Sequence, residues 1–374
     1  MHGFIGVHIG AGNHSEGLSR EYKRLCRSAC RVGVSTLLSG GTSVDAVMGA
    51  TVALEASDLT NAGYGSNLNI NGSVEVDAGV MEGETLAFGG VGAAPGMCHP
   101  VVIASELCKI QSKGFVAPSG LVAPSLLVGS GATKWAEISG LSHALSSSLI
   151  SEKAKRQYHR NKRKLQPFRK DEDFEMVQPP CSEDRLDTVG VVAMDAEGRV
   201  SAACSSGGIA LKQPGRVGQA AIFGAGCWAE NCGARGPGDG FQKESIAVCT
   251  TGCGEYLVRT GLAQQLAQAV QFCDDIATVR LHSAFTEKFL RSPLLRLVDE
   301  TGRLAGAIVL RGIGTAEKVE FLWAHSTKTM CIGYMVAAPE SKPKSHMSRL
   351  PVGFTPGSKV NVEGINLNLN SELG

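Results

Sequence analysis

The sequence predicts a mixed α/β fold, an αββα sandwich in which two stacked, mainly antiparallel sheets are covered by helices on both outer faces. Three observations lead to this expectation. Each half of the 374-residue chain has apolar, strand-like runs at both ends, helical patterns lie between those runs, and 43% of the residues are hydrophobic, enough for a large core. We expect one domain over residues 1–374, made of the halves 1–187 and 188–374.

The first half is expected to begin with a short apolar strand that runs into a glycine turn at Gly10–Gly12. Two helices follow by their apolar spacing, and Thr42 or Ser43 can cap the second. A polar glycine loop, a strand pair and a helix with proline in its first turn come next. The expected bounds are Phe4–Val7, Ser19–Leu38, Val44–Ala56, Asn61–Asn69 for the loop, Val74–Val80, Leu86–Val91 and Pro100–Gln111.

The second half opens with a hairpin whose two apolar strands are joined by the turn Asp195–Gly198. Thr188 stands directly before the first strand. A further strand, two helices and three closing strands are expected, and a polar tail with little periodicity ends the chain. The expected bounds are Val189–Met194, Arg199–Cys204, Ile246–Thr250, a helix through Gln271, Asp274–Leu290, Ala305–Arg311, Val319–His325 and Cys331–Ala337.

A charged segment, residues 146–187, separates the halves. It holds a basic cluster over Lys153–Lys170, then several acids and two prolines. Such composition cannot form a core, so we expect a solvated, mobile insertion. The basic run is equally typical of a nuclear-import signal or a polyanion-binding patch, so contact with the import machinery through 153–170 and a nuclear as well as cytoplasmic location are expected.

Composition excludes several classes of function. With a net charge of +1, the protein as a whole does not have the strongly basic surface that binds nucleic acid or membranes. No direct nucleic-acid role is therefore expected. The longest uncharged stretches are broken by prolines and glycines, which argues against a membrane span. The twelve cysteines lack zinc-type spacing, and the start of the chain lacks the features of a signal peptide. We therefore expect reduced thiols, no metal and no cofactor.

The candidate chemistry uses hydroxyls, amides and backbone groups. No serine lies in a Gly-x-Ser-x-Gly elbow and the histidines are scattered, so a serine triad is not indicated. Such a site can stabilise an oxyanion but lacks a base. Cleavage before Thr188 would supply one, because an N-terminal threonine carries its nucleophile and a free α-amine in one residue.

Six short motifs resemble the type-2 asparaginase family of N-terminal-nucleophile hydrolases, in the same order and across nearly all of the chain. Any one of them alone would be a weak signal. They are His8-x-Gly10-Ala11-Gly12, Asn61-Ala62-Gly63-x-Gly65, Asp187-Thr188-Val189-Gly190, Ser206-Gly207-Gly208, Pro214-Gly215-Arg216-Val217-Gly218 and Thr251-Gly252-x-Gly254-Glu255.

The resemblance implies roles for these positions. The precursor would cut itself between Asp187 and Thr188, the two chains would stay together, and two such heterodimers would associate as α2β2. Thr188 would be the nucleophile, supported by Ser206. The remaining roles would be polarisation of the scissile carbonyl by Thr251 and Asn61, a backbone contribution from Gly252, and binding of a substrate carboxylate by Arg216. A surface ion pair is the alternative for Arg216.

One departure from the family pattern bears on the substrate. Members that act on free amino acids or isoaspartyl peptides carry an acid three residues after this arginine, where it can pair with a substrate ammonium. Here the position is Gln219, which removes the electrostatic reason to require a free amine. Together with the basic insertion and the runs Gly226–Asn231 and Phe321–His325, Gln219 resembles the branch of threonine endopeptidases that cut after aspartate.

That branch implies internal Asp-Gly sites in nuclear regulators such as trithorax-type proteins and the precursor of the large subunit of transcription factor IIA. An L-asparaginase or isoaspartyl peptidase is the alternative, and a non-catalytic nuclear binding protein is a rival from another class. Two further positions stay open. Leu18, with Arg20 nearby, stands where family members have a lysine that attracts the acidic substrate. The loop Leu54–Thr60 resembles a family loop that holds a sodium ion, with Glu55 and Asp58 as candidate ligands, and is equally typical of an ordinary surface loop.

Overall fold

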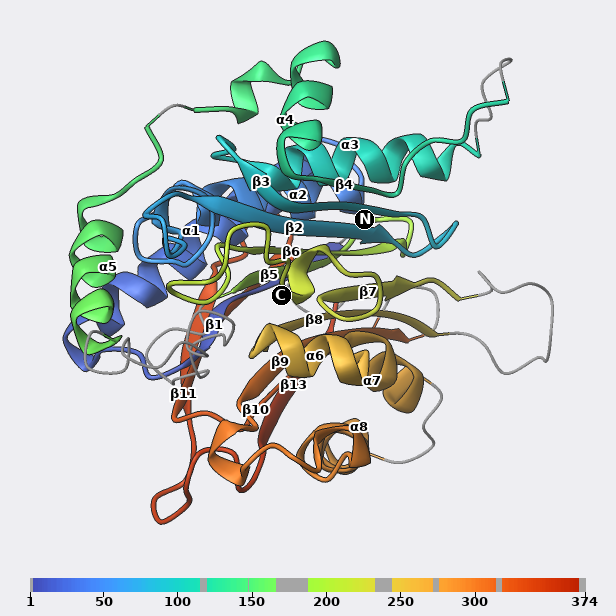
Figure 1. Cartoon of the computed structure of the whole chain (residues 1–374). Coiled ribbons are helices and arrows are strands. Elements are labelled where there is room, and N and C mark those ends of the chain that lie inside the picture. The colour runs from blue at the N-terminus through green and yellow to red at the C-terminus, as the bar shows by residue number, and fades with distance from the viewer. Residues whose placement is uncertain are drawn as a thin grey trace.

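The computed structural model of the chain describes residues 3–114, 120–146, 148–165, 188–232, 244–271, 276–313 and 318–369. Two sheets are stacked face to face, and helices lie against both outer faces of the stack (Figure 1). The predicted αββα arrangement is therefore confirmed. The expected mobile character of 166–187 concerns residues outside those described.

The larger sheet has eight strands in the order β12-β11-β1-β5-β6-β2-β3-β4, and every neighbouring pair is antiparallel except β3 and β4. The central position of β5 places the hairpin that follows Thr188 in the middle of this sheet. The bounds are β1 (Gly3–Gly12), β2 (Glu75–Glu82), β3 (Phe88–Pro95), β4 (Leu126–Val128), β5 (Val189–Met194), β6 (Val200–Ser206), β11 (Thr329–Ala337) and β12 (Lys344–Arg349).

The smaller sheet has five antiparallel strands in the order β13-β10-β9-β8-β7. Its central strands are the apolar runs that the sequence predicts, because strands covered on both faces have to be apolar throughout. The bounds are β7 (Cys227–Glu230), β8 (Glu244–Gly252), β9 (Ala305–Ile313), β10 (Lys318–His325) and β13 (Asn361–Asn368).

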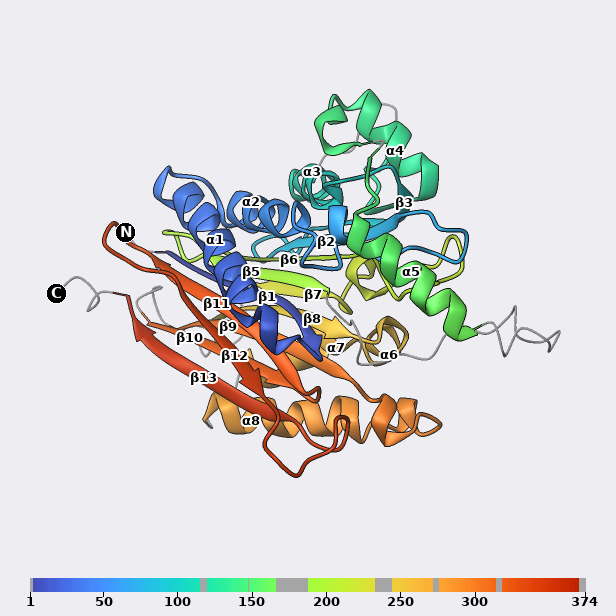
Figure 2. The same ribbon diagram turned by 90° about the vertical axis from the view of Figure 1, so that its left-hand side faces the viewer.

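Helices α1, α2 and α3 cover the outer face of the larger sheet, and α7 and α8 cover that of the smaller one (Figures 1 and 2). Thr42 caps α2 through a capping box with Asp45, as its sequence indicates. The bounds are α1 (Ser19–Leu38), α2 (Ser43–Glu55), α3 (Pro100–Ser112), α4 (Gly129–Ile138), α5 (Glu152–Leu165), α6 (Gly254–Thr260), α7 (Leu262–Gln271) and α8 (Ala277–Phe285).

Apolar side chains fill the space between the two sheets. The rings of Phe4 in β1 and Phe321 in β10 are 5.4 Å apart between centroids. A Cβ atom on Gly6 would lie 2.3 Å from a ring carbon of Phe321, so this sheet contact needs glycine. A second core lies between the larger sheet and its helices and includes Ile5 and Val47.

Two expectations about polar segments are wrong. Residues 152–165, expected to be a mobile part of the insertion, form α5, because Ala154, Gln157 and Tyr158 give this basic helix an inner face that packs on the protein. The tail, expected to lack periodicity, contributes β12 and β13. Both are edge strands, so solvent reaches one side of each and polar residues are tolerated there. None of the described helices is both long and apolar enough to cross a membrane.

Candidate active site

The predicted nucleophile lies where β5 begins. Val189 of β5 is opposite Ser205 of β6, so Thr188 and Ser206 are neighbours across the strand pair. The end of β8, in the other sheet, lies at the same small cavity. The described residues that line this cavity are Asn61, Thr188, Ser206, Gly208, Ile209, Arg216, Gln219, Gly252 and Gly254.

The Thr188 hydroxyl is buried in a chain of hydrogen bonds. It donates to the Ser206 hydroxyl at 3.0 Å and accepts from the Gln219 side-chain amide, also at 3.0 Å. The Ser206 oxygen accepts in turn from the backbone N–H of Gly208 at 3.0 Å. These bonds fix the direction of the Thr188 oxygen, as a nucleophile requires.

Asn61 organises the turn that follows β6. Its amide donates to the Gly208 carbonyl at 2.8 Å, and its side-chain oxygen accepts from the Asn67 N–H at 2.8 Å. Gly208 has a φ of +70°, and a Cβ atom there would lie 2.8 Å from Nη1 of Arg216. Glycine is therefore needed at this position, and the turn brings Asn61, Ser206 and Arg216 together.

Arg216 forms a two-pronged ion pair with Glu255 in α6. Its Nε and Nη2 atoms donate to the two carboxylate oxygens at 2.9 and 2.8 Å. Burial alone would raise the pKa of the Glu255 carboxyl, but the bonds from Arg216 outweigh it and lower that pKa. The pair turns the guanidinium so that Nη1, which makes neither bond, lies beside Gly208 at the cavity.

The turn that carries Arg216 is anchored by a buried charge. Asp77 in β2 accepts hydrogen bonds from the N–H groups of Ala93 at 2.8 Å and Gly218 at 2.9 Å. Burial raises the pKa of its carboxyl, opposed by the charge of Lys212 and by those two N–H groups. Lys212 is also fully buried, and its ammonium donates to the Glu75 carbonyl at 2.7 Å.

Sequence reasoning assigned no role to Asp77, Lys212 or Glu255. The sequence carried a signal for Asp77, since it is one of two acids, with Glu75, within the otherwise apolar run Val74–Val80. Glu255 belongs to a recognised motif, but the motif alone does not identify its partner. These three residues act on the cavity through Arg216 and its turn.

Of the three residues predicted to act at the carbonyl, Asn61 and Gly252 line the cavity and Thr251 does not. Gly252 lines the cavity with a φ of +144°, and a Cβ atom there would lie 2.5 Å from the Leu304 carbonyl oxygen. Thr251, one residue earlier in β8, is fully buried and is not among the described residues that line the cavity. Asp187 lies outside the described residues.

The loop after α2 is held by protein groups. The Glu55 carboxylate points inward and accepts from the Ser205 hydroxyl at 2.6 Å and from the Val101 N–H at 3.2 Å, with His99 at 3.3 Å. Burial raises the pKa of Glu55. The Glu55 side chain is therefore fully buried and bonded to protein groups. Among the described residues no group of three or more His, Cys, Asp or Glu is placed to hold a metal ion.

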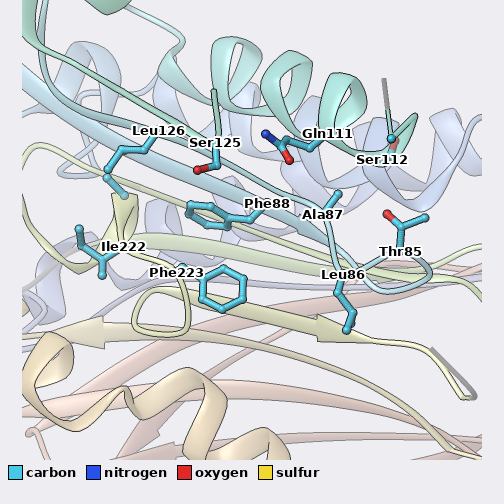
Figure 3. A pocket seen from close by; sticks show the side chains of 12 residues that line it. Thr85, Leu86, Ala87, Phe88, Gln111, Ser112, Ser125, Leu126, Ile222 and Phe223 are labelled. Atoms are coloured by element: carbon cyan, nitrogen blue, oxygen red, sulfur yellow. The ribbon is translucent and has the colours of Figure 1, made fainter. Parts of the chain in front are cut away.

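The other positions of interest lie outside the cavity. Leu18 lies in a short 3-10 turn against the core beneath α1, and Arg20 is exposed. A larger groove of about 810 Å³ is lined by Phe88, Leu126 and Phe223 among others (Figure 3). None of the described residues that line it belongs to the predicted site.

Comparison with known proteins shows the family of the chain. The asparaginase family model matches residues 1–342. The chain is 33% identical to the plant-type L-asparaginase of Pyrobaculum calidifontis over 331 residues, 88% of this chain and 95% of that protein. It is 34% identical to the human isoaspartyl peptidase/L-asparaginase over 265 residues, 71% of this chain and 75% of that protein. The mouse isoaspartyl peptidase/L-asparaginase is 33% identical over 300 residues, 78% and 81% of the two chains. The chain therefore belongs to the type-2 asparaginase family of N-terminal-nucleophile hydrolases.

Proposed function

We propose that this chain is a threonine endopeptidase that cleaves polypeptides after aspartate, as taspases (threonine aspartases) do, once it has cut itself between Asp187 and Thr188. The observation that carries the proposal is the neutral amide of Gln219, 3.0 Å from the Thr188 hydroxyl. A carboxylate there would attract a substrate ammonium. An amide gives no such preference, so an aspartate inside a polypeptide can be accepted.

The reaction uses groups that surround Thr188. Its free α-amine takes the hydroxyl proton while Oγ1 attacks the carbonyl carbon after the substrate aspartate. Gly252 and Asn61, which line the cavity, stabilise the oxyanion, and the buried Thr251 positions Gly252 as its neighbour in the chain. The peptide C–N bond breaks, the proton passes to the leaving amine, and water then hydrolyses the acyl ester. Ser206 orients the nucleophile throughout, and no cofactor takes part.

Arg216 supplies recognition of the aspartate side chain. Its Nη1 is at the cavity, while Glu255 fixes the plane of the guanidinium. A planar guanidinium held in this way suits a carboxylate better than a lysine would, because two N–H groups can be presented in a fixed direction.

An L-asparaginase or isoaspartyl peptidase is the second candidate, and the names of the relatives described above favour it. One comparison separates the two. The purified enzyme is offered free L-asparagine, an isoaspartyl dipeptide and a peptide with a Gln-apolar-Asp-Gly site. The proposal expects cleavage of the last after aspartate. Rapid hydrolysis of the small substrates with the peptide left intact would establish the second candidate instead.

The remaining proposals concern the cellular setting. We propose α2β2 assembly, nuclear as well as cytoplasmic location through 153–170, and nuclear regulators with internal Asp-Gly sites as substrates, including trithorax-type proteins and the transcription factor IIA precursor. Deleting 153–170 should move the protein toward the cytoplasm. An unchanged nuclear signal would remove the basis for the proposed location.

A further inference from the structure

Helix α5 is fastened to the loop that supplies Asn61. The Lys153 ammonium donates to the Asp58 carbonyl at 2.9 Å, and the Tyr158 hydroxyl donates to the Ile70 carbonyl at 3.0 Å. Figures 1 and 2 place α5 at the edge of the sandwich where the loops after β6 lie. The helix is therefore attached at two points to the loop that supplies the cavity residue Asn61.

The Ile70 end of this loop also meets the turn that follows Ser206. The Ile70 N–H donates to the Lys212 carbonyl at 2.9 Å, and the Leu211 N–H donates to the Leu68 carbonyl at 2.8 Å. Within the described part of the chain, the segment 58–70, which includes the cavity residue Asn61, thus links α5 to the turn after Ser206. A segment that served targeting alone would have no physical reason for this attachment.

The outward face of α5 carries one acid, Glu152, in its first turn and is basic from Lys155 to Lys164. Two rows of exposed side chains follow the helical spacing of four residues, so they lie side by side on one face. At a rise of 1.5 Å per residue the rows span about 14 Å. The rows are Lys155, His159 and Arg163, and Arg156, Arg160 and Lys164.

These charges are not compensated within the described protein. None of the five lysines and arginines in the two rows forms an ion pair with a described residue. Like charges four residues apart destabilise a helix by a few tenths of a kcal/mol per pair. A merely solvated face would more readily carry mixed charges throughout, so a face with five cations and a single acid, Glu152 at its end, points to an anionic partner.

We propose that this basic face of α5 is an exosite that binds an acidic stretch of the polypeptide substrate while the scissile bond lies at Thr188. The inference rests on the proposed endopeptidase function. An extended chain advances about 3.3 Å per residue, so the 14 Å rows match an acidic run of four to five residues. Binding there adds affinity without touching the reacting groups, because the exosite and the cavity hold different parts of one chain.

The test compares peptides with one Asp-Gly site and either a five-residue acidic run or a matched glutamine run, placed at several distances on either side of the site. The triple variant Arg156→Gln, Arg160→Gln and Arg163→Gln removes three charges and keeps good helix formers. The matched control removes three exposed cations near α8, Lys288→Gln, Arg291→Gln and Arg296→Gln. Circular dichroism and formation of the fragment that starts at residue 188 check folding.

The wild-type protein should prefer at least one acidic peptide over its neutral match. The α5 variant should lose about ten-fold in kcat/KM on that peptide through KM, and change neither kcat nor cleavage of the neutral peptide. The preference should shrink at 1 M salt, where the screening length is about 3 Å. The control variant should behave as wild type.

Three outcomes would overturn the exosite. Equal cleavage of acidic and neutral peptides by the wild type would do so while leaving the endopeptidase intact. An equal loss in the control variant would show a general charge effect. Loss of nuclear accumulation with unchanged cleavage would assign the face to an import receptor. Cleavage of neither peptide by the wild type would refute the proposed function itself.

Discussion

Replacing Asp77 by asparagine should destabilise the protein and misplace the Arg216 turn. The Asp77 carboxylate is fully buried and accepts from two backbone N–H groups, those of Ala93 and Gly218. Asparagine keeps one acceptor oxygen but turns an NH2 group toward the other N–H, which then has no partner. It also removes the negative charge that faces Lys212.

The size of the effect follows from these contacts. An unsatisfied buried N–H costs about 1–3 kcal/mol, and leaving the buried Lys212 cation without its opposing charge costs at most about 3–5 kcal/mol. The second cost is reduced here, because burial lowers the pKa of Lys212 and its ammonium can release a proton once Asp77 is neutral. We therefore expect the free energy of unfolding to fall by about 2–5 kcal/mol.

Urea unfolding and peptide-cleavage kinetics measure the two consequences. Loss of the Gly218 anchor should lower kcat/KM by about 100-fold, because displacements near 1 Å in positioning groups have effects of this size. Asp299→Asn, a change at an exposed acid, is the matched control. An Asp77→Asn protein within about 0.5 kcal/mol of wild type, with kcat/KM unchanged, would refute the role given to this carboxylate.

Three further predictions concern the cavity. Ser206→Ala should lower kcat about 10- to 100-fold, because the Thr188 hydroxyl loses its acceptor. Ser206→Thr keeps the hydroxyl, so its kcat should stay near that of the wild type. Equal losses of kcat in both variants would contradict the orienting role of Ser206. Glu255→Gln should raise KM for the peptide with little change in kcat, since Arg216 loses its two-pronged partner, and an unchanged KM would show that the pair does not matter. The pKa of Glu255 is lowered in the folded protein, so its pair with Arg216 is intact above the ordinary carboxyl pKa of about 4.3 and is lost as pH falls through the lowered value. At higher pH, kcat/KM should rise through about 7.7–8.0, where the α-amine of Thr188 loses its proton. A flat pH profile in that range would argue against this amine as the base.

Local patterns in the sequence were sufficient for much of the fold. The hairpin after Thr188 was predicted because two apolar runs flank an Asp-Ala-Glu-Gly turn, and α1 was predicted with its observed bounds from apolar spacing. The motifs located Asn61, Ser206 and Gly252 at one cavity. Each of these signals lies within a few consecutive residues.

The missed features depend on contacts between distant segments. Asp77 and Gly218 are 141 residues apart, and Arg216 and Glu255 are 39 apart, so no local pattern pairs them. The charge of residues 152–165 predicts a mobile segment, whereas the structure has helix α5 there. Its contact through the Tyr158 hydroxyl is with the Ile70 carbonyl, 88 residues away, which no local pattern reveals. Burial of a charge is decided by the tertiary structure, and composition cannot reveal it.

The central claim is that Thr188 becomes a free N-terminus. Intact-mass measurement of the purified protein, with N-terminal sequencing of the fragments, tests it most directly. We expect the 39.1 kDa chain to split into two chains that purify together, the second beginning at Thr188, and Thr188→Val to abolish both the split and peptide cleavage. An uncut chain that cleaves substrate, or a Thr188→Val protein as active as wild type, would show that Thr188 is not an N-terminal nucleophile.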